Sequence, residues 1–289
     1  MKKYLSLIAF SHTLFALPFA MVGFFLGHLH RPESEFPFRE LVLVLLCMVF
    51  ARSAAMAFNR YADRHIDRKN PRTASREIPS GAITPKSALG FVIASSLSFI
   101  LCTWLINPIC FYLSPVALLV VLGYSYTKRF TPLCHLILGL GLALAPIGAY
   151  LAVAGVFHLV PILFGGAVLC WVSGFDIIYA LQDDEFDKTH RLFSIPVALG
   201  RRGALGLSIA LHLVCAGFIT SAVFMVSQTL PEIFGWITWV ATGFFLSMLI
   251  YQHLIVSPNN LSRVNRAFFT TNGFASLIFG ALFILDVYI

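Results

Sequence analysis

The chain has 289 residues, of which 58% are hydrophobic and only 11% are charged. Soluble proteins carry about 25% charged residues, so this composition excludes an ordinary soluble fold and indicates an integral membrane protein. The net charge of +7 does not indicate nucleic-acid binding, because the basic residues lie in short connections between apolar runs, as in membrane proteins.

Nine apolar runs follow one another along the chain, most of them close to the length of about 20 residues that crosses a bilayer as a helix. They are predicted at 5–29, 41–62, 87–106, 109–127, 133–154, 158–181, 204–227, 233–256 and 267–288. No low-complexity segment or flexible linker separates them, so we expect one all-α membrane domain over residues 1–289. All six cysteines lie in apolar runs without metal-ligand spacing, and we expect small buried side chains there.

Lysine and arginine are distributed unevenly over the connections between these runs. Seventeen of the 20 lie at the N-terminus, in Lys2 and Lys3, or around the connections that follow the second, fourth, sixth and eighth runs. Only Arg31 and Arg39 lie on the opposite side, and Arg52 lies inside the second run. The positive-inside rule therefore predicts that the N-terminus and these four connections face the cytoplasm.

The end of the second apolar run carries polar side chains at helical spacing. Asn59, Asp63 and Asp67 are four residues apart and would lie on one face of a helix; we call them the first acidic row. Arg52, seven residues before Asn59, falls on roughly the same face. Placing an acidic residue near a bilayer costs free energy, so clustered acidic residues there indicate a functional role.

The end of the sixth run repeats this arrangement. Asp183 and Asp187 form the second acidic row, and Asp176 and Tyr179 continue its face toward the membrane interior. The neighbouring acids Asp184 and Glu185 are off this face, and we expect them to be solvated and outside any metal site.

A divalent cation would relieve the repulsion between two facing rows of carboxylates. Magnesium takes oxygen ligands from one or two carboxylates and completes its octahedron with water and substrate phosphate. Basic side chains next to the rows then favour a diphosphate ligand, because metal ions and basic side chains together neutralise its oxygens. These side chains are Arg72, Arg76, Lys128, Lys188 and Arg191.

Each of these features has a simpler explanation when taken alone. A single DxxxD at a helix end is often solvated charge or a helix cap, and basic loop residues often only set topology. Tyr124 and Tyr126 are also consistent with interfacial aromatic residues. The conjunction of two rows on the same predicted side, with Tyr124 to Lys128 between them, favours the metal–diphosphate interpretation.

These motifs together resemble the UbiA superfamily of intramembrane aromatic prenyltransferases. The family pattern NxxxDxxxD preceded by Arg matches Arg52, Asn59, Asp63 and Asp67, and continues through Arg72–Gly81 with Glu77 where many relatives carry Pro. The second pattern matches Asp176, Tyr179, Asp183, Asp187 and Lys188, and the tyrosine–lysine loop matches Tyr124 and Lys128. The resemblance covers nearly the whole chain and implies a single nine-helix bundle with an internal polar active-site chamber.

The resemblance also implies a reaction and a role for each residue. A polyprenyl diphosphate binds through two Mg²⁺ ions, loses diphosphate, and the allylic cation alkylates an aromatic acid in quinone biosynthesis. The implied metal ligands are Asn59, Asp63, Asp67, Asp183 and Asp187, the four aspartates among them being catalytic together with Lys128. The implied substrate-binding residues are Arg52, Arg72, Arg76, Tyr124, Asp176, Tyr179 and Lys188.

The identity of the acceptor is not decided by the residues. The segments Phe10–Ala20 and Asp176–Asp187 resemble a bacterial branch usually described as 4-hydroxybenzoate polyprenyltransferases, which implies a bacterial inner membrane. Arg52 is the candidate partner of the acceptor carboxylate. An alternative is that Arg52 only pairs with Asp63 or Asp176. A second alternative is a dihydroxynaphthoate acceptor, used in the futalosine route to menaquinone, and haem or chlorin prenylation would need a much larger chamber.

Two other classes of protein use acidic residues on membrane helices. A cation-coupled transporter is one alternative, but transporters bind substrate near the bilayer midplane, whereas these acids lie at one predicted edge. A lipid-head-group phosphotransferase is less consistent, because its acids form one contiguous series and here there are two separate rows. Neither the length of the prenyl tail nor the oligomeric state can be predicted from the sequence.

Overall fold

The computed structural model describes Leu7 and residues 15–31 and 35–289, and within these residues the chain contains helices and no β-strand. It divides into two compact units. Unit 1 comprises Met1–Thr13 and Pro37–Thr127, and unit 2 comprises Leu14–Phe36 and Lys128–Ile289. The all-helical membrane architecture predicted from the sequence is confirmed, and the acidic rows fall in different units.

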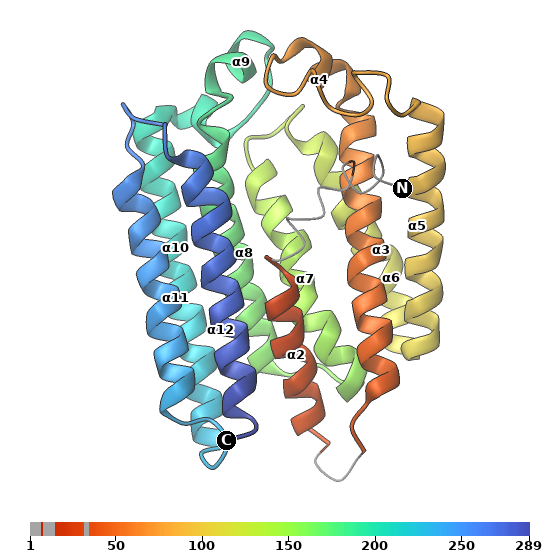
Figure 1. Ribbon diagram of the computed structural model, residues 1–289, viewed down its shortest axis with the longest axis vertical. Coiled ribbons are helices and arrows are strands. Elements are labelled where there is room, and N and C mark those ends of the chain that lie inside the picture. The colour runs from red at the N-terminus through yellow and green to blue at the C-terminus, as the bar shows by residue number, and fades with distance from the viewer. Residues whose placement is uncertain (1–6, 8–14, 32–34) are drawn as a thin grey trace. The chain divides into compact units, whose positions relative to one another are not determined.

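Unit 1 contains three long helices that pack against one another and one short helix (Figure 1). They are α3 (Phe38–Ala62), α4 (Arg64–Lys69), α5 (Pro85–Ile106) and α6 (Pro108–Thr127). Thr84 begins α5 by accepting a hydrogen bond from the Ser87 amide at 3.1 Å, a standard N-cap followed by proline at the first helical position. Asn107 alone separates α5 from α6, and its side chain accepts from the Cys110 amide at 2.9 Å.

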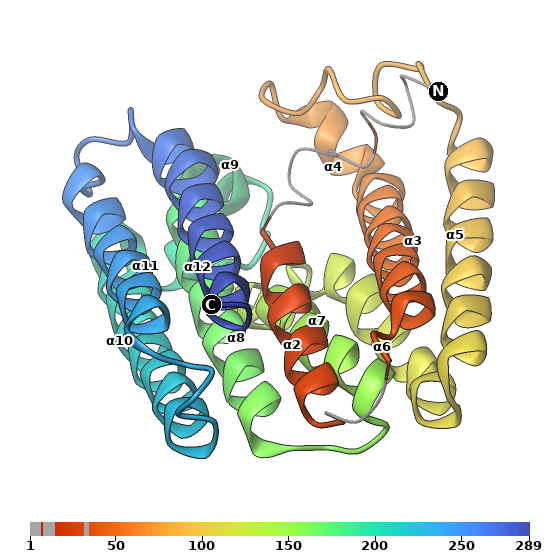
Figure 2. The ribbon, with the colours of Figure 1, turned by 60° about the horizontal axis from the view of Figure 1, so that its bottom comes forward.

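Unit 2 contains the remaining helices, which Figure 2 shows from a second direction. They are α2 (Leu17–Leu29), α7 (Cys134–Ala154), α8 (Leu159–Ala180), α9 (Asp184–Thr189), α10 (Ile195–Thr229), α11 (Trp236–Ile255), the π-helix η2 (Arg266–Thr271) and α12 (Asn272–Asp286). Helix α8 packs against both α7 and α10, and α2 packs against α7 and α12.

The core of unit 2 surrounds Trp171 of α8, which is fully buried. Its ring lies against Phe19 and Phe245, with centroid distances of 5.5 Å in each case. The indole N–H donates to Asn272 Oδ1 at 2.8 Å, and Asn272 Nδ2 donates to two carbonyls of the π-helix at 3.0 Å. Asn272 therefore supplies hydrogen-bond partners both for the buried indole N–H and for two carbonyl groups of the π-helix. Polar groups in an apolar interior require such partners.

The predicted spans agree with the observed helices to within a few residues, with two differences. Among the described residues, eight helices are long and apolar enough to cross a membrane, and the 13-residue α2 is a shorter ninth. Most of the first run before residue 15, including the start of the segment 10–20, lies outside the described residues, as do Lys2 and Lys3. Helix α10 begins at Ile195, nine residues before the predicted 204, and it contains a break at Gly200, where φ is +67°.

The junction between α12 and α11 depends on one buried carboxylate. Asp286 Oδ2 accepts hydrogen bonds from the Gly235 amide at 2.9 Å, the Thr238 amide at 3.0 Å and the Thr238 hydroxyl at 2.6 Å. Asp286→Asn weakens these charge-assisted bonds, so we expect the free energy of unfolding to fall by about 2 kcal/mol. The thermal midpoint of the detergent-solubilised protein measures this loss. Ser247→Ala on the exposed side of α11 is the control, and equal midpoints for both variants would refute the role of Asp286.

Candidate functional site

The first acidic row of unit 1 extends over two helices rather than one. Helix α3 ends at Ala62, and Asp63 has a backbone conformation of φ −89° and ψ 2° before α4 begins. The Asp63 amide still donates to the Asn59 carbonyl at 2.9 Å, and the Asp67 amide donates to the Asp63 carbonyl at 2.8 Å. The four-residue spacing is therefore maintained by hydrogen bonds across the junction, and the Asn59 amide group also donates to Asp63 Oδ2 at 3.3 Å.

Both aspartates of this row are almost completely buried, with 1% of Asp63 and 3% of Asp67 exposed. Arg76 Nη1 lies 2.7 Å from Asp67 Oδ1, whereas Asp67 Oδ2 is buried and has no hydrogen-bond partner in the described part of the chain. A buried carboxylate oxygen without a partner is costly. Oxygen is also the donor that Mg²⁺ prefers, so the residues present fit a bound Mg²⁺.

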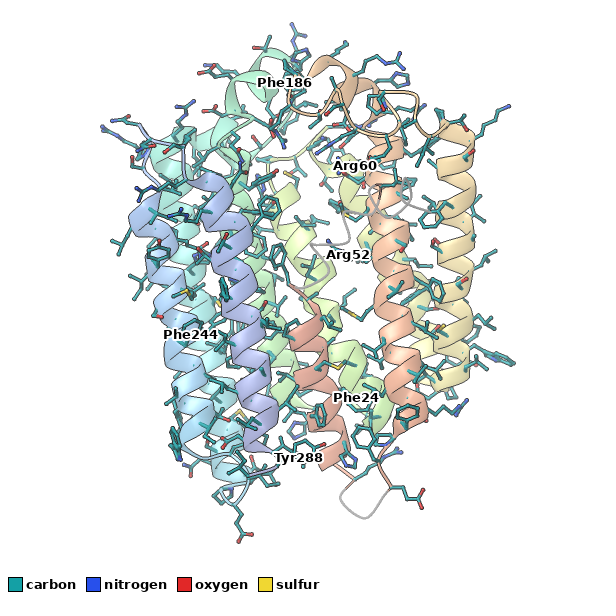
Figure 3. The ribbon with its side chains drawn as sticks, in the orientation of Figure 1. Phe24, Arg52, Arg60, Phe186, Phe244 and Tyr288 are labelled. Carbon is teal, nitrogen blue, oxygen red and sulfur yellow. The ribbon has the colours of Figure 1, made fainter. Side chains whose placement is uncertain are left out.

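Two partly buried arginines of α3, Arg52 and Arg60, are labelled in Figure 3, and some of their guanidinium nitrogens are buried without a hydrogen-bond partner in the described chain. In the described chain, the Nε atom of Arg52 and the Nε and Nη1 atoms of Arg60 have no hydrogen-bond partner. Unsatisfied buried N–H groups of this kind suit an anionic ligand. Arg52 was predicted from its spacing, but Arg60 was not, because nothing in the sequence distinguishes it from its basic neighbours Arg64 and Arg68.

The other predicted substrate residues of unit 1 differ in their surroundings. Tyr124 of α6 lies near enough to Arg52 and Arg60 to interact with them electrostatically. Arg72 is exposed, and its amide donates to Asn70 Oδ1 at 2.9 Å. Arg76 is held by Asp67, so the structure joins Arg76 directly to the first acidic row.

The second acidic row of unit 2 repeats the construction of the first. Helix α8 ends at Ala180, Asp183 precedes the first residue of α9, and the Asp187 amide donates to the Asp183 carbonyl at 2.8 Å. Asp176 and Tyr179 lie on α8, before the turn. The continuous helical face expected from Asp176 to Asp187 is thus interrupted, and the Tyr179 ring lies against Phe268 with centroids 4.2 Å apart.

The carboxyl group of Asp187 has a pKa raised to about 6. Burial is the largest cause, the charge of Asp183 acts in the same direction, and Lys128, Ser194 and His135 oppose it. In this environment a neighbouring cation would favour the ionised form, which is the form that binds metal. Lys128, predicted near the rows from sequence, is therefore an electrostatic partner of Asp187 within unit 2.

The two acids excluded from the second row have different surroundings. Glu185 is exposed, as expected, with 91% of its side chain accessible. The expectation that Asp184 is solvated is wrong: Arg201 donates to its two oxygens at 2.6 and 3.0 Å. Since Arg201 comes from α10, this bidentate pair fixes α9 to α10. Lys188 is exposed.

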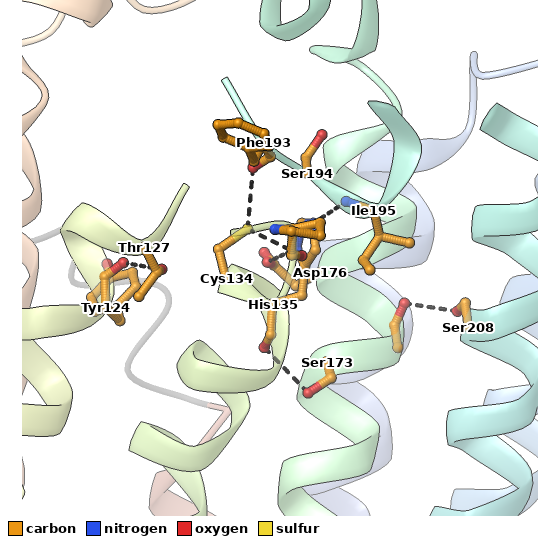
Figure 4. Close-up of polar contacts among 12 residues, drawn as sticks. Tyr124, Thr127, Cys134, His135, Ser173, Asp176, Phe193, Ser194, Ile195 and Ser208 are labelled. Carbon is orange, nitrogen blue, oxygen red and sulfur yellow. Dashed lines mark hydrogen bonds and ion pairs between the residues drawn. The ribbon is translucent and has the colours of Figure 1, made fainter. Parts of the chain in front are cut away.

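A polar contact that sequence reasoning did not find joins α7 to α8 (Figure 4). His135 Nδ1 lies 2.7 Å from Asp176 Oδ2, and the Ile195 amide donates to His135 Nε2 at 3.4 Å. His135 lies in an apolar run with no spacing signal that connects it to Asp176, which is 41 residues further along the chain.

Side chains alone do not make up a complete set of metal ligands in the described residues. In the described residues there is no group of three or more His, Cys, Asp or Glu side chains placed to hold a metal ion by themselves. Mg²⁺ does not need such a group, because it retains water and takes oxygens from substrate phosphates. The six cysteines are free, as expected from their positions.

Comparison with known proteins identifies the family. The model described as "UbiA prenyltransferase family" matches residues 16–278. A 4-hydroxybenzoate octaprenyltransferase of Photobacterium profundum is 31% identical over 83% of this chain and 81% of its own, and one of Tolumonas auensis is 30% identical over 85% and 84%.

Solved structures show the same fold. The apo structure of a UbiA homolog from Aeropyrum pernix K1 superposes with a TM-score of 0.83 at 35% identity, covering 95% of this chain and 98% of that one. A UbiA homolog from Archaeoglobus fulgidus, bound to GPP and Mg²⁺, has a TM-score of 0.73 at 24% identity, with 99% and 100% covered. Together with the acidic rows and their buried surroundings, these similarities establish that the chain belongs to the UbiA prenyltransferase family.

Proposed function

We propose that this protein transfers a polyprenyl group from a polyprenyl diphosphate to an aromatic acid, 4-hydroxybenzoate, in quinone biosynthesis. The relatives named 4-hydroxybenzoate octaprenyltransferase support both the donor and the acceptor class. The observation that carries the proposal is in unit 1. There a buried carboxylate oxygen of Asp67 and buried N–H groups of Arg52 and Arg60 have no partners in the described chain, so α3 and α4 carry groups that suit both a cation and an anion.

The two acidic rows, Asn59, Asp63 and Asp67 with Asp183 and Asp187, are the groups that hold two Mg²⁺ ions in this proposal. Bound Mg²⁺ supplies positive charge that stabilises the diphosphate as it leaves. A solved family member that contains GPP and Mg²⁺ supports this choice of metal. Asn59 adds a neutral oxygen, which limits the negative charge of the ligand set.

The basic residues divide between the two substrates. Lys128, Lys188, Arg72 and Arg76 neutralise the diphosphate oxygens, with Lys128 also opposing the charge of Asp187. Fixed cations of this kind stabilise charge that develops in the transition state. Arg52 binds the carboxylate of the acceptor, assisted by Tyr124. The unpartnered Nε of Arg52 favours this role over a purely structural ion pair.

The membrane setting follows from the same proposal. The eight long apolar helices support a multi-pass membrane protein, and the distribution of Lys and Arg supports an orientation in which both rows face the cytoplasm of a bacterial cell. An internal chamber that excludes water would protect the allylic cation from hydrolysis. A single functional domain over residues 1–289 is part of this proposal, and the family model indeed covers segments of both units.

A product assay tests the proposal. The purified protein, Mg²⁺ and a long-chain prenyl diphosphate are incubated with equal concentrations of 4-hydroxybenzoate and dihydroxynaphthoate, and the lipid products are identified by mass spectrometry. We expect prenylated 4-hydroxybenzoate as the main product. Prenylated dihydroxynaphthoate as the main product would reassign the acceptor, and the absence of any Mg²⁺-dependent product would refute prenyl transfer.

A further inference from the structure

The imidazole ring of His135 is held from both of its nitrogen atoms. An amide N–H can only donate, so His135 Nε2, which lies 3.4 Å from the Ile195 amide, is the acceptor there. Nδ1 therefore carries the proton and donates a hydrogen bond to Asp176 Oδ2 at 2.7 Å. In this arrangement Nδ1–H points at Asp176, the Ile195 amide fixes the orientation of the ring, and Asp176 is the negatively charged acceptor.

The backbone around His135 makes this arrangement rigid. The Ser173 hydroxyl lies 3.2 Å from the His135 carbonyl oxygen. The Phe193 amide, two residues before Ile195, donates to the Lys128 carbonyl at 2.7 Å. The chain that leads into α10 is thus attached to residue 128, and the Ile195 amide at the start of α10 holds the ring of His135. The imidazole cannot turn away from Asp176 without breaking the Ile195 contact.

The two partners differ in accessibility. Only 4% of the His135 side chain is exposed, against 20% of the Asp176 side chain. Asp176 lies four residues before the end of α8, about 6 Å inside the helix at 1.5 Å per residue, whereas Asp183 and Asp187 lie beyond that end. The carboxylate of Asp176 is therefore the more accessible group of the pair, and it is separate from Asp183 and Asp187, which are assigned to metal binding.

We propose that His135 is a positioning residue that holds Asp176 as the hydrogen-bond acceptor for the phenol O–H of the aromatic substrate. This inference rests on the proposed function. A carboxylate accepts from a phenol but repels the substrate's carboxylate, so Asp176 also determines which end of the ring it binds. A bond from the phenol O–H to an anion makes the ring more electron-rich, which favours its attack on the allylic cation.

The test compares two aromatic acids that differ only in the O–H group. 4-Hydroxybenzoate donates a hydrogen bond, and 4-methoxybenzoate, measured as a competitive inhibitor, does not. His135→Leu removes the donor to Asp176, and we expect the KM for 4-hydroxybenzoate to rise about ten-fold. The inhibition constant of 4-methoxybenzoate and the KM for the prenyl diphosphate should stay within about two-fold, because neither ligand uses this contact.

Two further variants separate positioning from general damage. His135→Asn places an amide N–H near the position of Nδ1–H, and we expect it to restore the KM for 4-hydroxybenzoate to within about three-fold of wild type. Ser208→Ala is the matched control, because its hydroxyl is buried and donates to the Gly174 carbonyl at 2.7 Å, away from the imidazole. It should leave all three constants unchanged.

The possible outcomes are distinguishable. An unchanged KM for 4-hydroxybenzoate in His135→Leu, or an equal change in all three constants, would overturn the positioning role while leaving prenyl transfer intact. Failure of His135→Asn to restore the KM, when the variant folds with a wild-type thermal midpoint, would also overturn it. Wild-type protein that forms no prenylated 4-hydroxybenzoate would refute the proposed function, and this inference with it.

Discussion

Asp63→Asn and Asp183→Asn are each expected to abolish prenyl transfer while the protein still inserts into the membrane. Each substitution removes the negative charge that binds Mg²⁺ but keeps the size of the side chain. Loss of metal-based stabilisation of the leaving diphosphate is worth several kcal/mol, so the initial rate at saturating Mg²⁺ should fall at least about 1,000-fold. The rate is measured with purified protein and normalised to the amount of folded protein in the membrane fraction.

Glu185→Gln is the matched control for these two variants. It also removes a carboxylate charge, from the same short helix that follows Asp183, but its side chain is 91% exposed. Its rate should remain at the wild-type level. Normal turnover by Asp63→Asn and Asp183→Asn with Mg²⁺ present would disprove the metal assignment of both rows.

Gly23→Ala is expected to have the largest effect on stability. A Cβ atom built at Gly23 of α2 would overlap the carbonyl oxygen of Pro146 in α7, and backbone cannot move aside as a flexible side chain can. Close helix contacts in membrane proteins depend on such small residues. Over-packing usually costs about 1–3 kcal/mol and sometimes more, and here we expect at least about 3 kcal/mol. The thermal midpoint of the solubilised protein measures it.

Gly148→Ala provides the comparison, because it also adds one methyl group to a helical glycine of unit 2. A Cβ atom at Gly148 would meet no atom within 4 Å, and alanine has the higher helix propensity. This variant should be as stable as wild type or slightly more stable. If both variants had the same midpoint, the close approach of α2 to α7 would not be a determinant of stability.

The sequence was sufficient to predict the membrane helices and the two acidic rows. Hydropathy predicts spans because every backbone polar group in a bilayer must be satisfied within its own helix, so each span depends on local composition. The four-residue spacing in Asn59, Asp63 and Asp67 is also local, and it is maintained even though Asp63 lies between two helices. Helix breaks at Asp63 and after Ala180 were not predicted, because no proline or glycine marks either position.

Three features of the candidate site depend on the tertiary structure. Asp184 is paired with Arg201, 17 residues away, His135 with Asp176, 41 residues away, and Arg60 is buried without its full set of acceptors. The first two are contacts between different helices, and helical periodicity states which face a residue occupies but not which helix packs against that face.

The sequence by itself determined the class of this protein, its spans and the chemical character of the two acidic rows, because each depends on the order and spacing of neighbouring residues. Tertiary structure alone decided which charges within a unit are paired and which are left for a ligand. The physical reason is burial: the charge of Arg60 or the carboxylate of Asp67 becomes a candidate binding group only when its surroundings remove water without supplying every partner.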